Sequence, residues 1–149
     1  MPLIYADSSV LFAYFHPKDN LALAVTEAAR GAGVDFIYWE WLRFEVRHNL
    51  RQARVDRWGE TAWNALRAAE KTSSRLRWQG DVHLSSILES ADELSEEKKP
   101  ECGSADVLHV AAARRISLLS SLDEFWTGDQ TQAALARQCG IKTRLLNSK

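Results

Sequence analysis

Cysteine and net charge are both scarce in this chain of 149 residues. The two cysteines, Cys102 and Cys139, show no C-x-x-C or other metal-type spacing, which argues against a zinc site and favours a reduced, cytoplasmic protein. The formal net charge is −1, so no overall basicity indicates nucleic acid. Any such binding would need a local basic patch.

Long apolar runs, targeting signals and phosphate loops are missing too. No apolar stretch approaches the ~20 residues that cross a bilayer, so we expect no membrane partner. The N-terminus lacks the basic region of a signal peptide. The sequence contains neither a G-x-x-x-x-G-K-[ST] nor a G-x-G-x-x-G loop, and no G-x-S-x-G elbow. With 46% hydrophobic and 26% charged residues, the composition is typical of one soluble domain spanning residues 1–149.

Short apolar runs alternate with helical patterns, which is typical of an α/β protein with a mainly parallel sheet. Strands are expected at four places: 3–6, 36–38, 116–121 and 141–146. Helices are expected over 8–15, 21–30 (ended by Gly31 and Gly33), 41–54 and 56–71. Three more are expected in the second half: one after a loop that starts at 78, one that starts at 104, and one from 129 to just before Gly140.

Carboxylates occur where the expected strands end and where helices begin. Asp7 ends the first apolar run, and Asp123 follows the run 116–121. Glu45 and Asp106 lie near the starts of two helices. Asp7 and Asp106 also suit helix N-termini, so a capping role is the alternative for each. Because ligands bind outside the carboxyl ends of the strands in such sheets, all four side chains could converge there.

Four carboxylates at one edge would repel one another unless a cation lay between them. Oxygen ligands suit hard ions, so Mg²⁺ or Mn²⁺ is the expected cofactor. Such an ion polarises a phosphoryl oxygen and generates hydroxide from water, which suits the hydrolysis of a phosphodiester.

The helix expected at 41–54 has two polar sides. Glu45 and Asn49 adjoin its apolar stripe, and four arginines lie roughly opposite them: Arg43, Arg47, Arg51 and Arg54. Nine basic and four acidic residues lie between 41 and 80, and seven acidic and two basic residues between 81 and 101. Such runs are usually solvated faces that pair with each other; a surface for RNA or an acidic partner is the alternative.

Four segments together resemble PIN-domain proteins of the VapC type, the ribonuclease toxins of bacterial and archaeal toxin–antitoxin pairs. They are YADSSVL with Asp7, FEVRHNL with Glu45, ADVLHVAAA with Asp106 and SLDEF with Asp123. They occur in the family's order and cover nearly the whole chain. The resemblance implies a three-layer αβα sandwich and a magnesium-dependent endoribonuclease in which these four carboxylates bind the metal. It also implies an RNA substrate, an antitoxin whose tail blocks the active-site groove, and a homodimer.

Two of the four positions have competitors. Residues 124–128 separate Asp123 from the next helix, so Asp129 is the alternative, and Asp123 is favoured because it directly follows the expected strand. Glu40 competes with Glu45, and the neighbouring Asn49 favours Glu45.

Two further residues are accessory candidates. Ser9 matches the family's hydroxyl position near the first Asp. His109 shares a helix face with Asp106 and could orient a carboxylate or contact substrate, although a packed, hydrogen-bonded histidine is the more frequent arrangement.

The residues leave two other functions open. The first is a non-catalytic PIN-like protein-binding module that acts through its helices and tryptophans; the intact acidic set argues against it. The second is a nuclease that acts on DNA or on ribosomal RNA precursors, which would share the site. The short chain, with no appended RNA-binding domain, disfavours the second.

Overall fold

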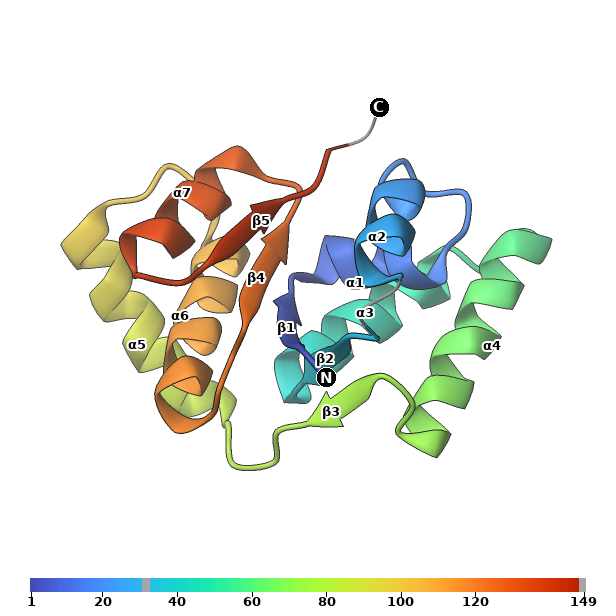
Figure 1. Cartoon of the computed structure of the whole chain (residues 1–149), viewed down its shortest axis with the longest axis horizontal. Coiled ribbons are helices and arrows are strands. Elements are labelled where there is room, and N and C mark those ends of the chain that lie inside the picture. The colour runs from blue at the N-terminus through green and yellow to red at the C-terminus, as the bar shows by residue number, and fades with distance from the viewer. Residues whose placement is uncertain (31–32, 148–149) are drawn as a thin grey trace.

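A computed structural model describes residues 1–30 and 33–147 of the chain (Figure 1). Gly31, predicted to help end the second helix, lies outside the described residues. The elements are β1 (Leu3–Ala6), α1 (Ser8–Phe15), α2 (Ala22–Ala29), β2 (Asp35–Tyr38), α3 (Glu40–Gln52), α4 (Arg57–Thr72), β3 (Leu76–Trp78), α5 (Leu84–Lys98), α6 (Ser104–Leu119), β4 (Glu124–Thr127), α7 (Gln130–Gln138) and β5 (Thr143–Leu145).

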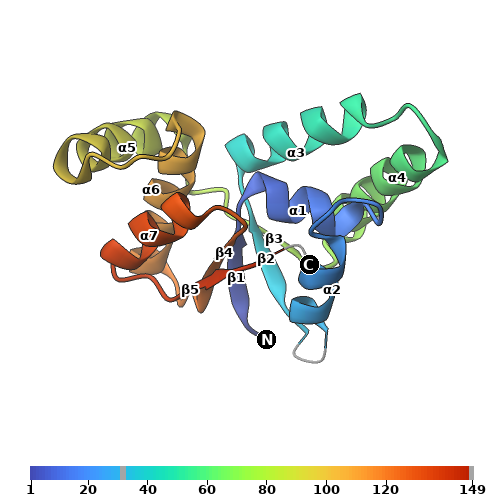
Figure 2. The same ribbon diagram turned by 90° about the horizontal axis from the view of Figure 1, so that it is seen from above.

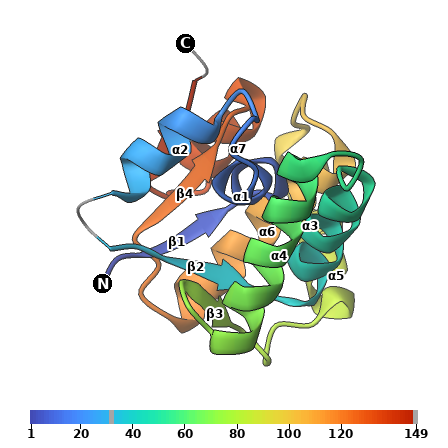
Figure 3. The same cartoon turned by 90° about the vertical axis from the view of Figure 1, so that its right-hand side faces the viewer.

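The five strands form one parallel sheet in the order β3-β2-β1-β4-β5, so the first strand of the chain is the central one. Figure 3 shows β1 between β2 and β4. Helices α1 to α4 lie on one side of the sheet and α5 to α7 on the other (Figure 2). The three-layer αβα architecture predicted from the sequence is therefore confirmed.

Helices on both faces explain why the central strand β1 is buried along its whole length. Every residue of β1 is buried, because neither face of a covered parallel sheet meets water. On the α5–α7 side, the run Ala111–Ala113 of α6 is also buried. Small side chains allow this helix to pack closely on the sheet, as the sequence predicts.

The strand predicted at 116–121 is wrong, because α6 continues through that segment to Leu119. Ile116 lies four residues after the buried Ala112 and continues the helical stripe that faces the sheet, whereas Leu118 is 77% exposed. The strand that follows is β4, at 124–127, which the sequence analysis did not predict. Strand β3 was also missed, inside the segment expected to be a helix and then a loop.

Among the described residues, none of the helices combines the length and the apolar character that a membrane crossing requires.

Candidate active site

Asp7 follows β1 and is the N-cap of α1. Its Oδ1 atom accepts hydrogen bonds from the backbone N of Val10 (2.9 Å) and from Oγ of Ser9 (2.7 Å). The side chain is only 5% exposed. Asp7 therefore both caps α1 and lies at the carboxyl end of the central strand. Ser9 lies beside Asp7, as predicted.

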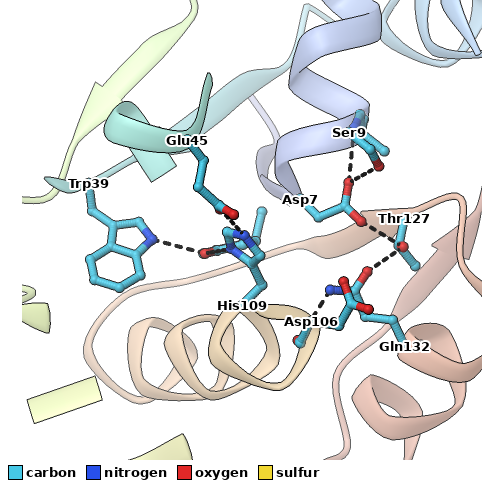
Figure 4. A network of polar contacts seen from close by, with 10 residues as sticks. Asp7, Ser9, Trp39, Glu45, Asp106, His109, Thr127 and Gln132 are labelled. Atoms are coloured by element: carbon cyan, nitrogen blue, oxygen red, sulfur yellow. Dashed lines mark hydrogen bonds and ion pairs between the residues drawn. The ribbon is translucent and has the colours of Figure 1, made fainter. Parts of the chain in front are cut away.

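The second oxygen of Asp7 joins it to the neighbouring strand. Oδ2 accepts a hydrogen bond from Oγ1 of Thr127, the last residue of β4, at 2.8 Å. Thr127 Oγ1 in turn accepts from the backbone N of Asp129 (3.0 Å), and Gln132 of α7 lies against it. Gln132 donates from Nε2 to the backbone O of Asp106 (3.2 Å). We call this group the aspartate network: Asp7, Asp106, Thr127, Asp129 and Gln132. Figure 4 shows four of its members, Asp7, Asp106, Thr127 and Gln132.

Two aspartates of the network influence the pKa of the third. The pKa of Asp106 is raised, first by burial and then by the nearby negative charges of Asp129 and Asp7. The pKa of Asp129 is lowered, because the hydroxyl of Thr131 and the backbone N–H groups of Gln132 and Thr131 donate to it as the cap of α7. Like charges gathered in this way cost free energy unless they serve a ligand.

Asp123 lies away from this network, at the other end of the strands. It precedes β4, and its Oδ2 accepts a hydrogen bond from the backbone N of Leu3 (2.7 Å), while its own backbone N donates to the O of Leu3 (2.8 Å). Both contacts are at the amino ends of β1 and β4. The predicted position of Asp123 at the carboxyl edge is therefore wrong, because the apolar run before it is helical. Asp129, the alternative weighed from the sequence, stands at that edge instead.

Glu45 projects from α3 and contacts a buried histidine of α6. His109 Nε2 lies 2.5 Å from Glu45 Oε1. The other ring nitrogen, Nδ1, lies 2.7 Å from the hydroxyl of Tyr5, and that hydroxyl accepts a hydrogen bond from Nε1 of Trp39 (2.9 Å). We call this series of Trp39, Tyr5, His109 and Glu45 the Tyr5 chain. Figure 4 labels three of its members, Trp39, His109 and Glu45. His109 is buried and hydrogen-bonded through both ring nitrogens, which is the arrangement that the sequence favoured, and one of its two partners is the carboxylate of Glu45.

The competing residue Glu40 is engaged elsewhere. Its Oε1 accepts a hydrogen bond from the backbone N of Leu84 at the start of α5 (2.6 Å), and the residue is exposed. Asn49, predicted beside Glu45, lines a cleft of about 630 Å³ together with Ser9 and Gly128. Because Ser9 contacts Asp7, this cleft opens next to the aspartate network.

Tyr5 is buried, and its pKa is raised well above the usual range by burial, with the charges of Glu45 and Asp7 adding to the effect. The phenol is therefore neutral and keeps its proton at any physiological pH. Trp39 and His109 are 0% and 1% exposed.

No three of the His, Cys, Asp and Glu side chains in the described parts of the chain stand close enough together to hold a metal ion. The chemistry of the donors nevertheless suits a hard cation, because Asp7, Asp106 and Asp129 offer only oxygen and already interact through their charges. Carboxylates that repel one another come together when a cation neutralises them.

Sequence reasoning missed four residues of the two networks: Tyr5, Trp39, Thr127 and Gln132. Tyr5 lies two residues before Asp7, so strand periodicity places both on one side of β1. The run Thr127-Gly128-Asp129 at the end of β4 again brings a hydroxyl and a carboxylate together, as Asp7 and Ser8 do after β1. The short length of β4 and the apolar run before it concealed that repeat.

No protein-family model matches the chain, and no curated protein matches it by sequence. Solved structures do. VapC20 of Mycobacterium tuberculosis, a sarcin-ricin loop cleaving toxin, matches with a TM-score of 0.63 and 16% identity, over 88% of this chain and 93% of its own. VapBC2 of Rickettsia felis, bound to a DNA fragment from its promoter, matches with a TM-score of 0.62 and 10% identity, over 97% and 99%.

A third structure, FitAcB of Neisseria gonorrhoeae, matches with a TM-score of 0.54 and 16% identity, over 94% of this chain and 95% of its own. Identities this low establish the fold alone. The fold of this chain is that of the PIN-domain toxins, as the resemblance in the sequence predicts.

Proposed function

We propose that this protein is a metal-dependent endoribonuclease and the toxin component of a toxin–antitoxin pair. One observation carries the proposal: Asp7, Asp106 and Asp129 arrive from three separate segments at the carboxyl edge of a PIN-like sheet and interact through their charges. A cluster maintained at this cost suits a catalytic site better than a structural one. The similarity to VapC20, a sarcin-ricin loop cleaving toxin, supports RNA as the substrate class.

The proposed cofactor is Mg²⁺ or Mn²⁺, held by Asp7, Asp106 and Asp129 with Glu45 as a fourth carboxylate. When bound, such an ion neutralises charge on the scissile phosphate and promotes attack by water. Ser9 and Thr127 keep the carboxylate of Asp7 in one orientation through their hydroxyl groups. The cap contacts of Asp129 hold that side chain ionised at neutral pH, since they lower its pKa.

The basic side of α3 and α4 is proposed to contact RNA phosphates. Part of it is neutralised, since Arg47 pairs with Glu70 and Arg54 with Glu60. Other guanidinium groups stack on tryptophans without a carboxylate partner in the described part of the chain: Arg43 on Trp78 (4.5 Å), Arg51 on Trp63 (5.2 Å) and Arg57 on Trp58 (4.7 Å). A stacked arginine keeps its donors available for phosphate.

A cognate antitoxin is the proposed protein partner. A cleft of about 600 Å³ lies between α3, α5 and α6, and its walls are largely apolar, with Trp41, Leu84 and Leu88 among them. Leu88 is 51% exposed. An apolar segment of an antitoxin would bury this surface beside Asp106. The homodimer stays a prediction, which sedimentation of the purified protein would test.

The deciding experiment measures RNA cleavage by antitoxin-free protein in EDTA, in Mg²⁺ and in Mn²⁺, with Asp7→Asn as the matched control. Asparagine is as good an N-cap as aspartate, so α1 stays capped while the charge, and with it one acceptor for the Thr127 hydroxyl, is lost. We expect cleavage that requires the metal and falls at least ~10³-fold in the variant, a loss of ~4 kcal/mol of transition-state stabilisation.

The non-catalytic binding module predicts a different result. A folded wild-type protein that takes up no Mn²⁺ by calorimetry and cleaves no RNA, including ribosomal RNA, would favour it. Cleavage at full rate by Asp7→Asn would show that the active site lies elsewhere.

A further inference from the structure

The Tyr5 chain connects the centre of the core to Glu45. Its members come from four places in the fold: Tyr5 from β1, Trp39 from the residue between β2 and α3, His109 from α6 and Glu45 from α3. The heavy-atom distances along it are 2.9, 2.7 and 2.5 Å. Three of the four residues are at most 1% exposed, whereas the side chain of Glu45 is 18% exposed. The chain is therefore fixed at its buried end and reaches the active-site edge at Glu45.

The donors and acceptors assign the protons. The indole of Trp39 can only donate, so the hydroxyl of Tyr5 accepts from it and has one proton to give. That proton is donated to Nδ1 of His109. The neutral ring then carries its own proton on Nε2 and donates it to the carboxylate of Glu45. This arrangement satisfies every polar atom of the three buried side chains with one direction of donation, from Trp39 to Glu45.

Simple packing does not account for a histidine at this position. The neighbours of His109 along α6, from Val107 to Ala113, are buried and apolar, and a leucine would fill the space without needing two hydrogen-bond partners. A whole set of buried polar groups can often be replaced by apolar side chains at little cost in stability, so stability alone does not require this series. The series ends on a carboxylate at the site, which is where a positioning function would place it.

Glu45 is held by one oxygen only. Oε1 faces His109, and within residues 1–30 and 33–147 Oε2 has no hydrogen-bond donor. A glutamate has three side-chain torsions, so an unsupported carboxylate at position 45 of α3 would sample several orientations. The contact with His109 removes that freedom and leaves Oε2 for a ligand.

We infer that His109, itself held by Tyr5 and Trp39, is a positioning residue that orients the Glu45 carboxylate toward the divalent cation of the proposed nuclease. The inference rests on the proposed function and adds to it the group that fixes one of its four carboxylates. Partners that orient a metal ligand typically contribute ~10–100-fold to metal affinity or activity. Asp7 and Asp129 are held by cap and hydroxyl contacts of their own, so neither depends on this chain as Glu45 does.

The test uses three variants that change the chain and one that does not. His109→Leu removes both nitrogen atoms, Tyr5→Phe removes only the hydroxyl, and His109→Gln restores an N–H donor near the position of Nε2. His48→Gln is the matched control, because His48 is an exposed histidine on the same helix as Glu45. Mn²⁺ affinity is measured by calorimetry, and cleavage is measured as a function of Mg²⁺ concentration.

We expect His109→Leu to weaken Mn²⁺ binding ~10–100-fold and to raise the Mg²⁺ concentration needed for half-maximal cleavage by a similar factor. The rate at saturating Mg²⁺ should fall much less. Tyr5→Phe should weaken Mn²⁺ binding several-fold, His109→Gln should recover part of the loss, and His48→Gln should match the wild type. Circular dichroism melts establish that each variant is folded, and Tyr5→Phe serves alone if His109→Leu does not fold.

The outcomes separate the inference from the proposed function. A wild type that binds Mn²⁺ and cleaves RNA, with His109→Leu or Tyr5→Phe binding Mn²⁺ equally tightly, overturns the inference and leaves the nuclease intact. A folded wild type that neither binds Mn²⁺ nor cleaves RNA overturns both.

Discussion

The aspartate network and the Tyr5 chain contain residues only two positions apart, Asp7 and Tyr5. They differ in that the network gathers negative charge, whereas the chain pairs its buried polar groups by hydrogen bonds. The network gathers negative charges at the edge of the sheet and raises the pKa of Asp106. The chain is neutral up to its last member, is almost completely buried, and has a partner for each polar atom of its buried side chains. Without a bound cation, the aspartate network raises the free energy of the folded protein, whereas the Tyr5 chain does not. We infer that the site combines a part that needs the cation with a part that prepares for it.

The largest effect on cleavage is expected from Asp106→Asn in the aspartate network. Removing this charge should lower the rate of RNA cleavage ~10³-fold, a loss of ~4 kcal/mol in transition-state stabilisation. The same change should raise the melting temperature of the metal-free protein by ~1–3 °C, because the repulsion from Asp129 and Asp7 is relieved. Single-turnover cleavage and melts in EDTA measure the two effects. Asp92→Asn, an exposed carboxylate of α5, is the control.

The gain in stability should depend on pH in a defined direction. Burial and nearby charges raise the pKa of Asp106 in the folded protein, so the penalty is full above that pKa and absent below the ordinary value of 3.8. The difference in melting temperature between wild type and Asp106→Asn should therefore shrink as the pH falls through the raised pKa. A difference that grows toward low pH would mean that Asp106 is stabilised in its ionised form.

The next largest effect separates the two candidates for the fourth carboxylate. Asp129→Asn should reduce cleavage ~10²-fold or more, a loss of ~2.7 kcal/mol, while asparagine still caps α7. Asp123→Asn should cleave at close to the wild-type rate, because this side chain contacts Leu3 at the far end of the strands. Initial rates of cleavage at saturating Mg²⁺ test the two variants. A larger loss in Asp123→Asn than in Asp129→Asn would identify Asp123 as the fourth carboxylate.

A smaller effect is expected where the aspartate network is held by a hydroxyl. Thr127→Val keeps the shape of the side chain but leaves Oδ2 of Asp7 and the backbone N of Asp129 without a partner. The unfolding free energy should fall by ~1–3 kcal/mol, as measured by urea denaturation. Thr127→Ser retains the hydroxyl and should stay near the wild type, and equal stability of all three proteins would remove Thr127 from the network.

The smallest effect is expected at the buried end of the Tyr5 chain. Trp39→Phe deletes one donor to the Tyr5 hydroxyl, which can still donate to His109. We expect a loss of ~1 kcal/mol in unfolding free energy and Mn²⁺ affinity within ~3-fold of the wild type. If Trp39→Phe weakened Mn²⁺ binding more than Tyr5→Phe does, the indole of Trp39 and not the hydroxyl of Tyr5 would be the group that orients Glu45 through His109.

Much of this architecture was predictable from the sequence, because apolar runs, helix caps and the small residues of α6 act locally. Asp7 and Ser9 follow β1 directly, so their neighbourhood could be inferred from a few residues. Asp123 could not be placed in this way. The run 116–119 has the same composition whether it forms a strand or the end of a helix, and only the continued stripe of α6 on the sheet decides between them. The contact of His109 with Glu45 joins residues 64 positions apart, so helix periodicity on either element could not reveal it.

The central position of β1 also governs when the proposed site can form during synthesis of the chain. Strand β1 pairs with β2 early, but its other neighbour, β4, lies 120 residues beyond Leu3. At ~5–20 residues per second, the ribosome needs roughly 6–24 s to make that stretch. Until then Asp7 lacks Thr127 and Asp129, so a nascent chain carries an incomplete site. The proposed nuclease would therefore gain its complete site only after almost all of the 149 residues have been made.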